Sequence, residues 1–244
     1  MRDMSILLIL AYLFFIGSVL GWILELLYRG YRHKKWVNPG FCRGPYLPIY
    51  GCSLCILYLL ALLEQYFLIT NPFWNKIALF TAITVCLTLM EYVAGLFCLK
   101  ILKVRLWDYS NCWGNIQGII CPRFSLYWSI MGAIYCFLIH SQILDALDWI
   151  SQNLSFSFFI GMFYGIFLID VISSAQLVVK LKQFAEENAI VLIYEEIKDH
   201  IRNSHLAVSA KYHFFSPFRS ERLLTEHLKE IAEKMERQIR KHQH

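Results

Sequence analysis

The chain has 244 residues, of which 57% are hydrophobic and only 17% are charged, and its formal net charge at pH 7 is +5. This composition excludes an ordinary soluble globular domain and is typical of an integral membrane protein. The charge is unevenly distributed, because more than half of the charged side chains follow residue 179. The sequence therefore predicts a membrane-embedded part, residues 1–180, and a polar tail, residues 181–244.

A bilayer core about 30 Å thick needs about 20 mainly apolar residues for one helical crossing. The stretches that meet this requirement are residues 5–28, 47–69, 77–99, 124–147 and 156–179. The predicted fold class is all-α: a polytopic membrane helix bundle of about five spans with a cytoplasmic helical tail.

The orientation of the bundle follows from the lysines and arginines beside the spans, which favour the cytoplasmic side. Nine of them lie in the segments after the first and third spans: Arg29, Arg32, Lys34, Lys35, Arg43, Lys100, Lys103, Arg105 and Arg123. Only Arg2 and Lys76 lie on the opposite side. We therefore expect a multi-pass protein of the cytoplasmic membrane, with its N-terminus outside and its C-terminus in the cytoplasm.

Two segments between predicted spans share the pattern GxxxGxxxP, which begins at Gly40 in one and at Gly114 in the other. A tryptophan and an asparagine precede the glycine in both, as Trp36 and Asn38 and as Trp107 and Asn111. Each segment also follows a span with one glutamate, Glu25 or Glu91. The pattern suggests a weak parallel repeat whose two cytoplasmic loops, residues 29–45 and 100–123, lie side by side; chance resemblance is the alternative.

Glycine and proline at the mouth of a membrane helix indicate a loop that folds back into the bundle, where protein or a water-filled cavity covers its backbone. We expect polar side chains of both loops to meet there in a binding or gating site. Its predicted residues are Glu25, Asn38, Gly40, Gly44, Pro45, Tyr46, Pro48, Tyr50, Gly51, Glu91, Trp107, Asp108, Tyr109, Ser110, Asn111, Asn115 and Gly118. An interfacial aromatic belt with prolines at helix starts is the alternative interpretation.

Glu91 and Asp170 are the acids placed deepest in the predicted spans, and intramembrane acids usually face a cavity, a partner or an ion path. At similar depth they could share a proton if their helices touch. Alternatively, each accepts hydrogen bonds from Tyr92, Ser173 or Ser174 and only fixes packing. Glu25 has the further alternative of an interfacial ion pair with Arg29.

The polar tail is nearly balanced in charge, so we expect no nucleic-acid binding. Within it, an apolar stripe on a charged helix is formed by Leu224, Leu228, Ile231, Met235 and Ile239. This stripe packs on the tail's first predicted helix, about residues 183–201, or associates with a second copy, or docks a partner subunit.

The sequence predicts no cofactor and no metal site. It has eight histidines but no HExxH or comparable spacing, and its cysteines, including the Cys52 and Cys55 pair, are typical of packed thiols. It also lacks a GxxxxGK[ST] phosphate loop and a GxSxG elbow. Whether the protein is an enzyme stays open, with the answer no favoured, and ATP hydrolysis would require another subunit.

Four motifs carry a resemblance to a known family: "GWILE" (21–25), "NPGFCRGPYLPIYG" (38–51), "EYVAG" (91–95) and "WDYSNCWGNIQGIIC" (107–121), followed by Trp128. Together they resemble the CmpB-like family of bacterial membrane proteins, named for type IV ABC transporters, over about residues 10–135. The resemblance implies a multi-span, permease-like protein. The chain departs from the family pattern at Pro39, where an arginine is usual, and at Cys112 and Trp113.

Three functions fit these observations. The first is a permease-like component of a transport system whose loops form a gate or a docking site for a separate ATPase subunit. The second is a non-catalytic sensor or scaffold that signals through the tail, and the third is a membrane enzyme that acts on a lipid headgroup with Glu25, Glu91 and Asp108 as acid or base. The partners expected are the lipid bilayer and either the ATPase subunit or a second copy of the chain.

Overall fold

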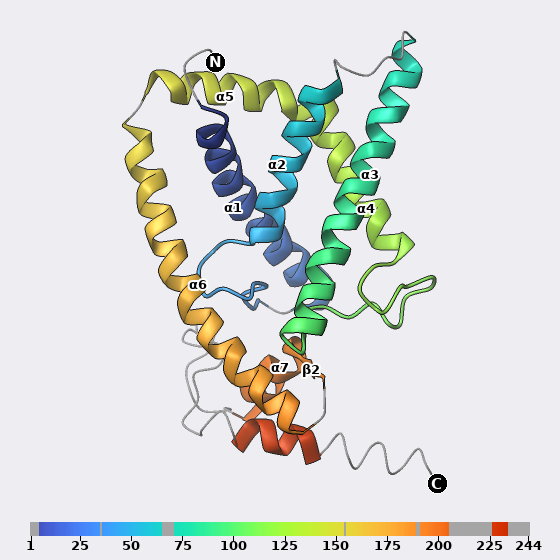
Figure 1. Cartoon of the computed structure of the whole chain (residues 1–244), viewed down its shortest axis with the longest axis vertical. Coiled ribbons are helices and arrows are strands. Elements are labelled where there is room, and N and C mark those ends of the chain that lie inside the picture. The colour runs from blue at the N-terminus through green and yellow to red at the C-terminus, as the bar shows by residue number, and fades with distance from the viewer. Residues whose placement is uncertain are drawn as a thin grey trace. The chain divides into compact units, whose positions relative to one another are not determined.

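The computed structural model describes residues 5–34, 36–64, 71–153, 155–188, 191–204 and 226–233. The chain forms two compact units (Figure 1). Unit 1 consists of Met1–Leu24, Pro45–Ala94 and Tyr109–Ile169, and unit 2 consists of Glu25–Gly44, Gly95–Asp108 and Asp170–His244. The domain boundary predicted at residue 180 stays a prediction.

Helices make up nearly all of the regular structure in the described part of the chain. They are α1 (Ile6–His33), α2 (Pro48–Leu63), α3 (Pro72–Leu96), α4 (Pro122–Ile134), α5 (His140–Gln152), α6 (Phe156–Glu187) and α7 (Tyr194–Ser204). Two π-helical stretches, η2 (Phe97–Ile101) and η3 (Tyr135–Ile139), follow α3 and α4, and two short strands are β1 (Val104–Arg105) and β2 (Leu192–Ile193). The predicted all-α class is confirmed.

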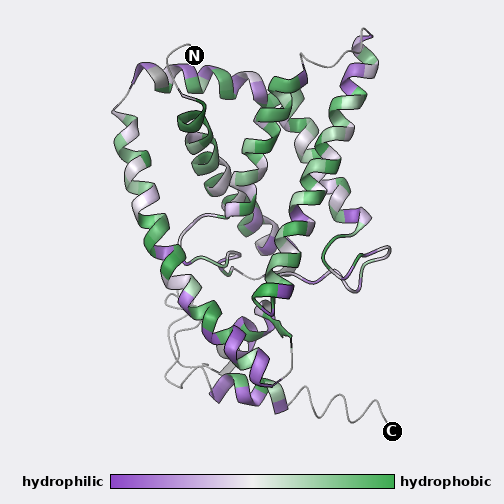
Figure 2. Cartoon of the chain, in the orientation of Figure 1, coloured by the Kyte–Doolittle hydropathy of each residue, from purple (hydrophilic) through white to green (hydrophobic). Residues whose placement is uncertain are grey.

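Within the part of the chain that the structure describes, four helical segments are long and apolar enough to cross a membrane: Ile6–Arg32, Pro72–Ile101, Pro122–Ile150 and Phe156–Glu187. The second predicted span corresponds to α2, which is apolar but has only 16 described residues. Its predicted end at residue 69 lies outside the described residues. The membrane helices are predominantly hydrophobic along their length (Figure 2), and large side chains such as Leu89, Val93 and Leu168 face outward, as lipid-facing residues do.

The fourth predicted span, residues 124–147, is not one straight helix. The π-helical stretch η3 separates α4 from α5, and α5 lies across the ends of α1 and α2 (Figure 1). Leu147 of α5 is buried against Tyr12 of α1, Tyr58 of α2 and Ile160 of α6. A π-helical turn is a common cause of a change in helix direction. Here it lets α5 bury an apolar face on three helices instead of continuing the crossing.

Small residues bring α1 and α2 into close contact within unit 1. A Cβ atom added to Gly51 would lie 2.3 Å from Ser18 Oγ and 2.6 Å from the carbonyl oxygen of Phe14, and one added to Gly21 would lie 2.2 Å from Tyr50 Cβ. The backbone N–H of Leu47 donates a 2.9 Å hydrogen bond to the carbonyl oxygen of Ser18 in the same contact. Small residues at such crossings allow membrane helices to pack without side chains between them.

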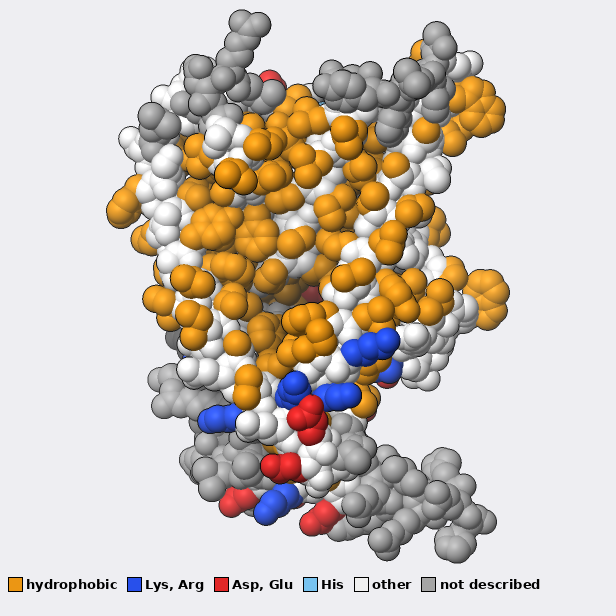
Figure 3. Space-filling model, viewed as in Figure 1, with side chains coloured by type: hydrophobic (Ala, Val, Ile, Leu, Met, Phe, Trp, Pro, Cys, Tyr) orange, Lys and Arg blue, Asp and Glu red, His pale blue; other side chains and the backbone are white. Residues whose placement is uncertain are grey.

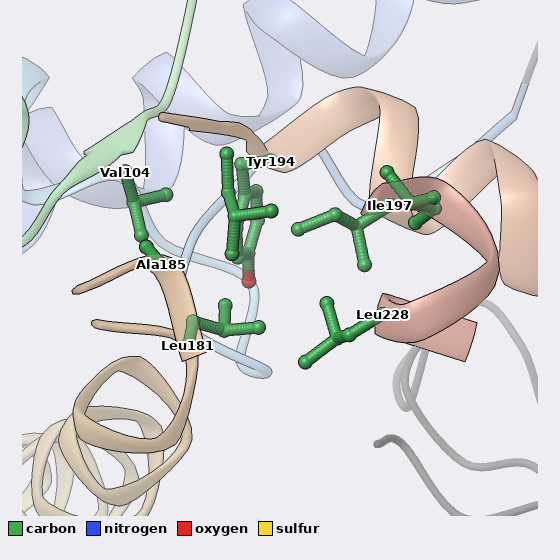
Figure 4. Packing of buried hydrophobic residues seen from close by; sticks show 8 residues of the cluster. Val104, Leu181, Ala185, Tyr194, Ile197 and Leu228 are labelled. Atoms are coloured by element: carbon green, nitrogen blue, oxygen red, sulfur yellow. The ribbon is translucent and has the colours of Figure 1, made fainter. Parts of the chain in front are cut away.

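Unit 2 has a hydrophobic core of its own (Figure 4). β1 and β2 pair in parallel, with Val104 opposite Leu192, and Val104 packs against Leu181 of α6. The tail's first helix is not the single segment predicted at about residues 183–201, because α6 continues to Glu187 and α7 begins at Tyr194. Between them lies β2, whose pairing with β1 requires extended backbone. On the face shown in Figure 3, most of the visible charged side chains gather in the lower part of the view.

The predicted apolar stripe of the tail is described in part. Residues 226–233 are helical, and Leu228 and Ile231 are buried in the core of unit 2. Ile197 of α7 faces Leu228 in that core (Figure 4). These two stripe residues therefore pack on the chain's own helices. The other three, Leu224, Met235 and Ile239, lie outside the described residues.

We predict that Gly51→Ala lowers the thermal unfolding midpoint of the detergent-solubilised protein, because overpacking a tight contact costs about 1–3 kcal/mol. Gly161→Ala is the matched control, since a Cβ atom there meets nothing within 4 Å and alanine favours a helix. Thermal unfolding followed by size-exclusion chromatography measures both variants. Equal midpoints for Gly51→Ala and Gly161→Ala would contradict the packing role of Gly51.

Candidate functional site

Glu91 of α3 is a buried acid in unit 1, with only 2% of its surface exposed. Its Oε1 atom accepts a 3.3 Å hydrogen bond from the hydroxyl of Tyr109. The indole N–H of Trp128 is the other polar neighbour of the carboxyl group, and Oε2 has no hydrogen-bond partner among the described residues. Glu91 lies ten positions before the end of its candidate span, or about 15 Å at 1.5 Å per residue. A carboxylate oxygen without a hydrogen-bond partner, such as Oε2, can bind a proton or a cation.

The loop from Tyr109 to Cys121 brings the tyrosine to Glu91 and is held by its own hydrogen bonds. The N–H of Tyr109 donates to the carbonyl oxygen of Gly118 at 2.8 Å, and the ring of Tyr109 stacks on Phe124 at 4.2 Å. Gly118 has φ +68°, in the left-handed region that glycine adopts without strain. Because the loop is bonded to itself, Tyr109 is positioned by a compact unit.

Trp128 of α4 links Glu91 to the start of α2. Its ring lies 5.0 Å from that of Tyr50, and both pack in a cluster with Leu87 of α3. The structure thus brings Glu91, Tyr109 and Tyr50 together around Trp128, a residue that was not predicted for the site. Its aromatic ring in an apolar helix gives no local signal that distinguishes it from a core residue.

Other predicted residues of unit 1 lie elsewhere. Tyr46 is buried against Phe163 and Phe167 of α6, so it does not join Tyr109. Pro48 is the first residue of α2, as helix-start prolines often are, and Gly51 is part of the α1 contact. The residues that remain exposed are Pro45, Ser110 and Asn111.

The first loop, residues 38–44, belongs to unit 2 and is organised by Asn38. Its Oδ1 atom accepts the N–H of Gly40 at 3.2 Å, and its Nδ2 donates to the carbonyl oxygens of Cys42 and Arg43, both at 3.0 Å. In the second loop Asn115 makes an equivalent set, accepting from Gly118 and donating to the carbonyl oxygens of Ser110 and Cys112. Asn115, and not the predicted Asn111, is therefore the counterpart of Asn38.

The repeat does not extend to backbone conformation. Gly114 and Gly118 have positive φ angles, whereas Gly40 and Gly44 do not. Both prolines of the pattern, Pro48 and Pro122, begin helices, and the residue before each is extended. The shared features are thus the asparagine and the helix start, while the glycines serve different purposes.

Asp170 of α6 anchors the first loop within unit 2. Its Oδ2 atom accepts the N–H of Gly44 at 2.8 Å, and its Oδ1 accepts the N–H of Arg43 and the hydroxyl of Ser174, both at 3.2 Å. The bond from Ser174 is one of those that the sequence suggested. These contacts give Asp170 a structural role, which explains a charged residue in the apolar part of α6.

Lys198 of α7 anchors the same loop from another element. Its ammonium group is buried and donates to the carbonyl oxygens of Asn38 at 3.2 Å and Gly40 at 3.0 Å. It also lies 4.5 Å from the centre of the Tyr194 ring, whose hydroxyl donates to the carbonyl oxygen of Phe41. Cation–π contact and two carbonyl acceptors offset the desolvation of a buried charge. Neither Lys198 nor Asp170 was predicted for the site, because each is far from the loop in sequence.

The remaining predicted residues of unit 2 form local ion pairs. Glu25 accepts a 3.0 Å bond from Arg29, and Asp108 accepts a 2.7 Å bond from Arg105. Both pairs lie within one helical turn or one short loop and are partly exposed, and such pairs near the surface contribute little stability. Trp107 precedes Asp108 and is partly exposed.

We predict that the first loop shields Cys42 from thiol reagents. Cys42 is buried, and burial, together with the negative charge of Asp170, raises the pKa of its thiol to about 12. At pH 8 only about one part in ten thousand is then thiolate, the reactive form, and this fraction rises with pH. In a variant that keeps Cys42 as its only cysteine, maleimide labelling should be slow.

Lys198→Met or Asp170→Asn should speed this labelling by at least about tenfold, because each removes bonds that hold the loop over Cys42. Lys182→Met, at a partly exposed lysine of α6 that pairs with Glu186, is the control and should leave the rate unchanged. Equal rates in all four proteins would show that the two anchors do not close the loop.

Residues 12–175, about two thirds of the chain, match a family described as "Putative ABC-transporter type IV". No curated protein and no solved structure matches the chain. The matched segment contains both loops, Glu91, Trp128 and Asp170, and it ends before the tail. The four membrane-length helices and this match together make the chain a multi-pass membrane protein that belongs to this ABC-transporter-related family.

Proposed function

We propose that the protein is the permease-like membrane component of a transport system, with Glu91 on the path of the transported substrate or a coupled ion. The observation that carries the proposal is the buried carboxyl group of Glu91, whose Oε2 atom makes no hydrogen bond among the described residues. An acid placed only to fix packing is expected to have both oxygens bonded, as Asp170 does. The family match supports the transport class.

Tyr109 is the gating residue in this proposal. Its hydroxyl donates to Glu91, and the 3.3 Å distance is long for a bond between a hydroxyl and a carboxyl group. A long bond is easily exchanged for a ligand. Because the loop is held by its own bonds, it can leave Glu91 as a unit.

The energy source lies outside this chain. The sequence has no phosphate-binding loop, so a transport cycle driven by ATP requires a separate ATPase subunit. Both predicted docking loops expose large aromatic side chains: Trp36 is 62% exposed and Trp113 is 88% exposed. Exposed tryptophans are enriched at protein interfaces and at the membrane surface. We propose that these two residues contact the ATPase subunit.

The scaffold hypothesis, in which the protein signals through its tail, has less support than the transport proposal. A scaffold that signals through the apolar stripe needs that stripe to be available, and Leu228 and Ile231 are buried in unit 2. The lipid-enzyme hypothesis gains no nucleophile from the described residues around Glu91. The burial of Leu228 and Ile231 and the surroundings of Glu91 therefore favour the transport proposal over the scaffold and lipid-enzyme hypotheses.

The proposed orientation predicts how single cysteines at exposed positions react with a thiol reagent. In a background without the native cysteines, Asn111→Cys should react with a membrane-impermeant thiol reagent only after the cells are permeabilised, because the second loop is cytoplasmic. Gln152→Cys, at the exposed end of α5, should react in intact cells. The reverse result would invert the topology. Native Cys42 and Cys121 are unsuitable probes because both are buried.

We predict that purification of the tagged protein from its native host in mild detergent recovers a stoichiometric ATPase subunit, identified by mass spectrometry. Trp36→Ala and Trp113→Ala should each reduce its recovery, because large aromatic residues often contribute about 2 kcal/mol or more to an interface. Leu168→Ala, which replaces an exposed apolar residue of a membrane helix, is the control.

Glu91→Gln should retain the ATPase subunit, since Glu91 is buried in α3, but should fail to restore the phenotype of a deletion strain. Normal insertion and a normal size-exclusion profile would show that the variant is folded. Full function of Glu91→Gln, or recovery of the protein with no ATPase subunit, would contradict the transport proposal.

A further inference from the structure

A group of metal-ligand side chains lies in unit 2. His200 of α7 and His227 and Glu230 of the helix 226–233 offer ligand atoms that all lie within 4.8 Å of one another. His227 and Glu230 are three positions apart, so they share a face of their helix. His200 is likewise three positions after Ile197, which faces Leu228 (Figure 4). The packing of the two helices therefore brings the three side chains together.

We propose that His200, His227 and Glu230 bind a divalent transition-metal ion, with Zn²⁺ as the expected ion. Two imidazoles and one carboxylate form a common zinc ligand set, and three protein ligands leave one tetrahedral position for water. The site is independent of the transport proposal. It was not expected from the sequence, because 27 positions separate His200 from His227 and no short ligand motif joins them.

The distances suit a shared ion. Two atoms that are each about 2.0–2.1 Å from a tetrahedral Zn²⁺ stand about 3.3 Å apart, and Nε2 of His200 lies 3.0 Å from Oε2 of Glu230. The rings of His200 and His227 are 5.6 Å apart between centres. The three ligand atoms lie within 4.8 Å of one another. Small rotations of the side chains would bring all three to the spacing that a tetrahedral ion requires.

Charge also favours a cation over a simple ion pair. If both rings were protonated, two like charges would stand side by side, whereas one divalent ion is satisfied by two neutral rings and a carboxylate. The helix 226–233 carries Glu226, Glu230 and Glu233 against the single cation Lys229. A bound ion would join this helix to α7 and hold the end of the described tail in place.

The test measures Zn²⁺ binding by the full-length protein, purified in detergent with a tag that contains no histidine and stripped with a chelator. The tail histidines outside the site, His205, His213, His242 and His244, are replaced by glutamine so that they do not bind the ion. Titration against a chromophoric zinc chelator should show one Zn²⁺ per chain.

His200→Ala and Glu230→Gln should each weaken this binding by at least about 10- to 100-fold, the loss caused by removing residues that merely support a ligand. Both side chains are partly exposed, at 28% and 48%, so both variants should fold. Glu226→Gln, at an exposed residue one turn earlier on the same helix, is the control and should bind as before.

Zinc should also slow trypsin cleavage after Lys229, because it holds the helix 226–233 against α7, and this protection should be lost in His200→Ala. The proposal is overturned if the background protein binds no Zn²⁺, if only one of the two ligand variants weakens binding, or if Glu226→Gln weakens it equally. None of these results bears on the ATPase subunit, so the two proposals fail separately.

Discussion

The need to satisfy backbone N–H and C=O groups beside apolar helices is the constraint on which both loops depend. An unbonded backbone group shielded from water costs several kcal/mol, so irregular backbone is tolerated only where protein supplies partners. Asn38 and Asn115 supply three bonds each within their own loops. Asp170 and Lys198 then bond the outer backbone of the first loop. The glycines and prolines shape these loops, but the side-chain amides hold them.

The two intramembrane acids show how such bonding separates structure from function. Asp170 has two backbone donors and one hydroxyl donor, so its charge serves the loop of unit 2. Glu91 accepts a long bond from Tyr109, has the indole N–H of Trp128 as its other polar neighbour, and keeps an oxygen with no hydrogen-bond partner among the described residues. An acid within a membrane-length helix therefore does not have one fixed role. The difference is that the first loop bonds Asp170 through backbone N–H groups, whereas the second loop bonds Glu91 through the side chain of Tyr109.

Unit 2 gives the loop and the tail a common core. Lys198, which fixes the first loop, and Ile197, which packs on Leu228, are neighbours on α7. A change in how the helix 226–233 is held, such as metal binding at His200, would therefore act two residues from Lys198, the loop's anchor. This arrangement offers a physical route by which the tail could influence the loop, carried by packed side chains of a single helix.

The sequence by itself determined the helical membrane class and the positions of the apolar spans, because these depend on composition and on local backbone preferences. It also predicted a site that includes Glu91, Tyr109 and Tyr50, and that site stays a prediction. Only the tertiary structure decided that Trp128 completes this group, that Tyr46 packs on α6 instead, and that η3 turns α5 across its neighbours. The contacts of Asp170 and Lys198 span more than 120 positions. No local pattern encodes such contacts, since they arise only when distant helices pack.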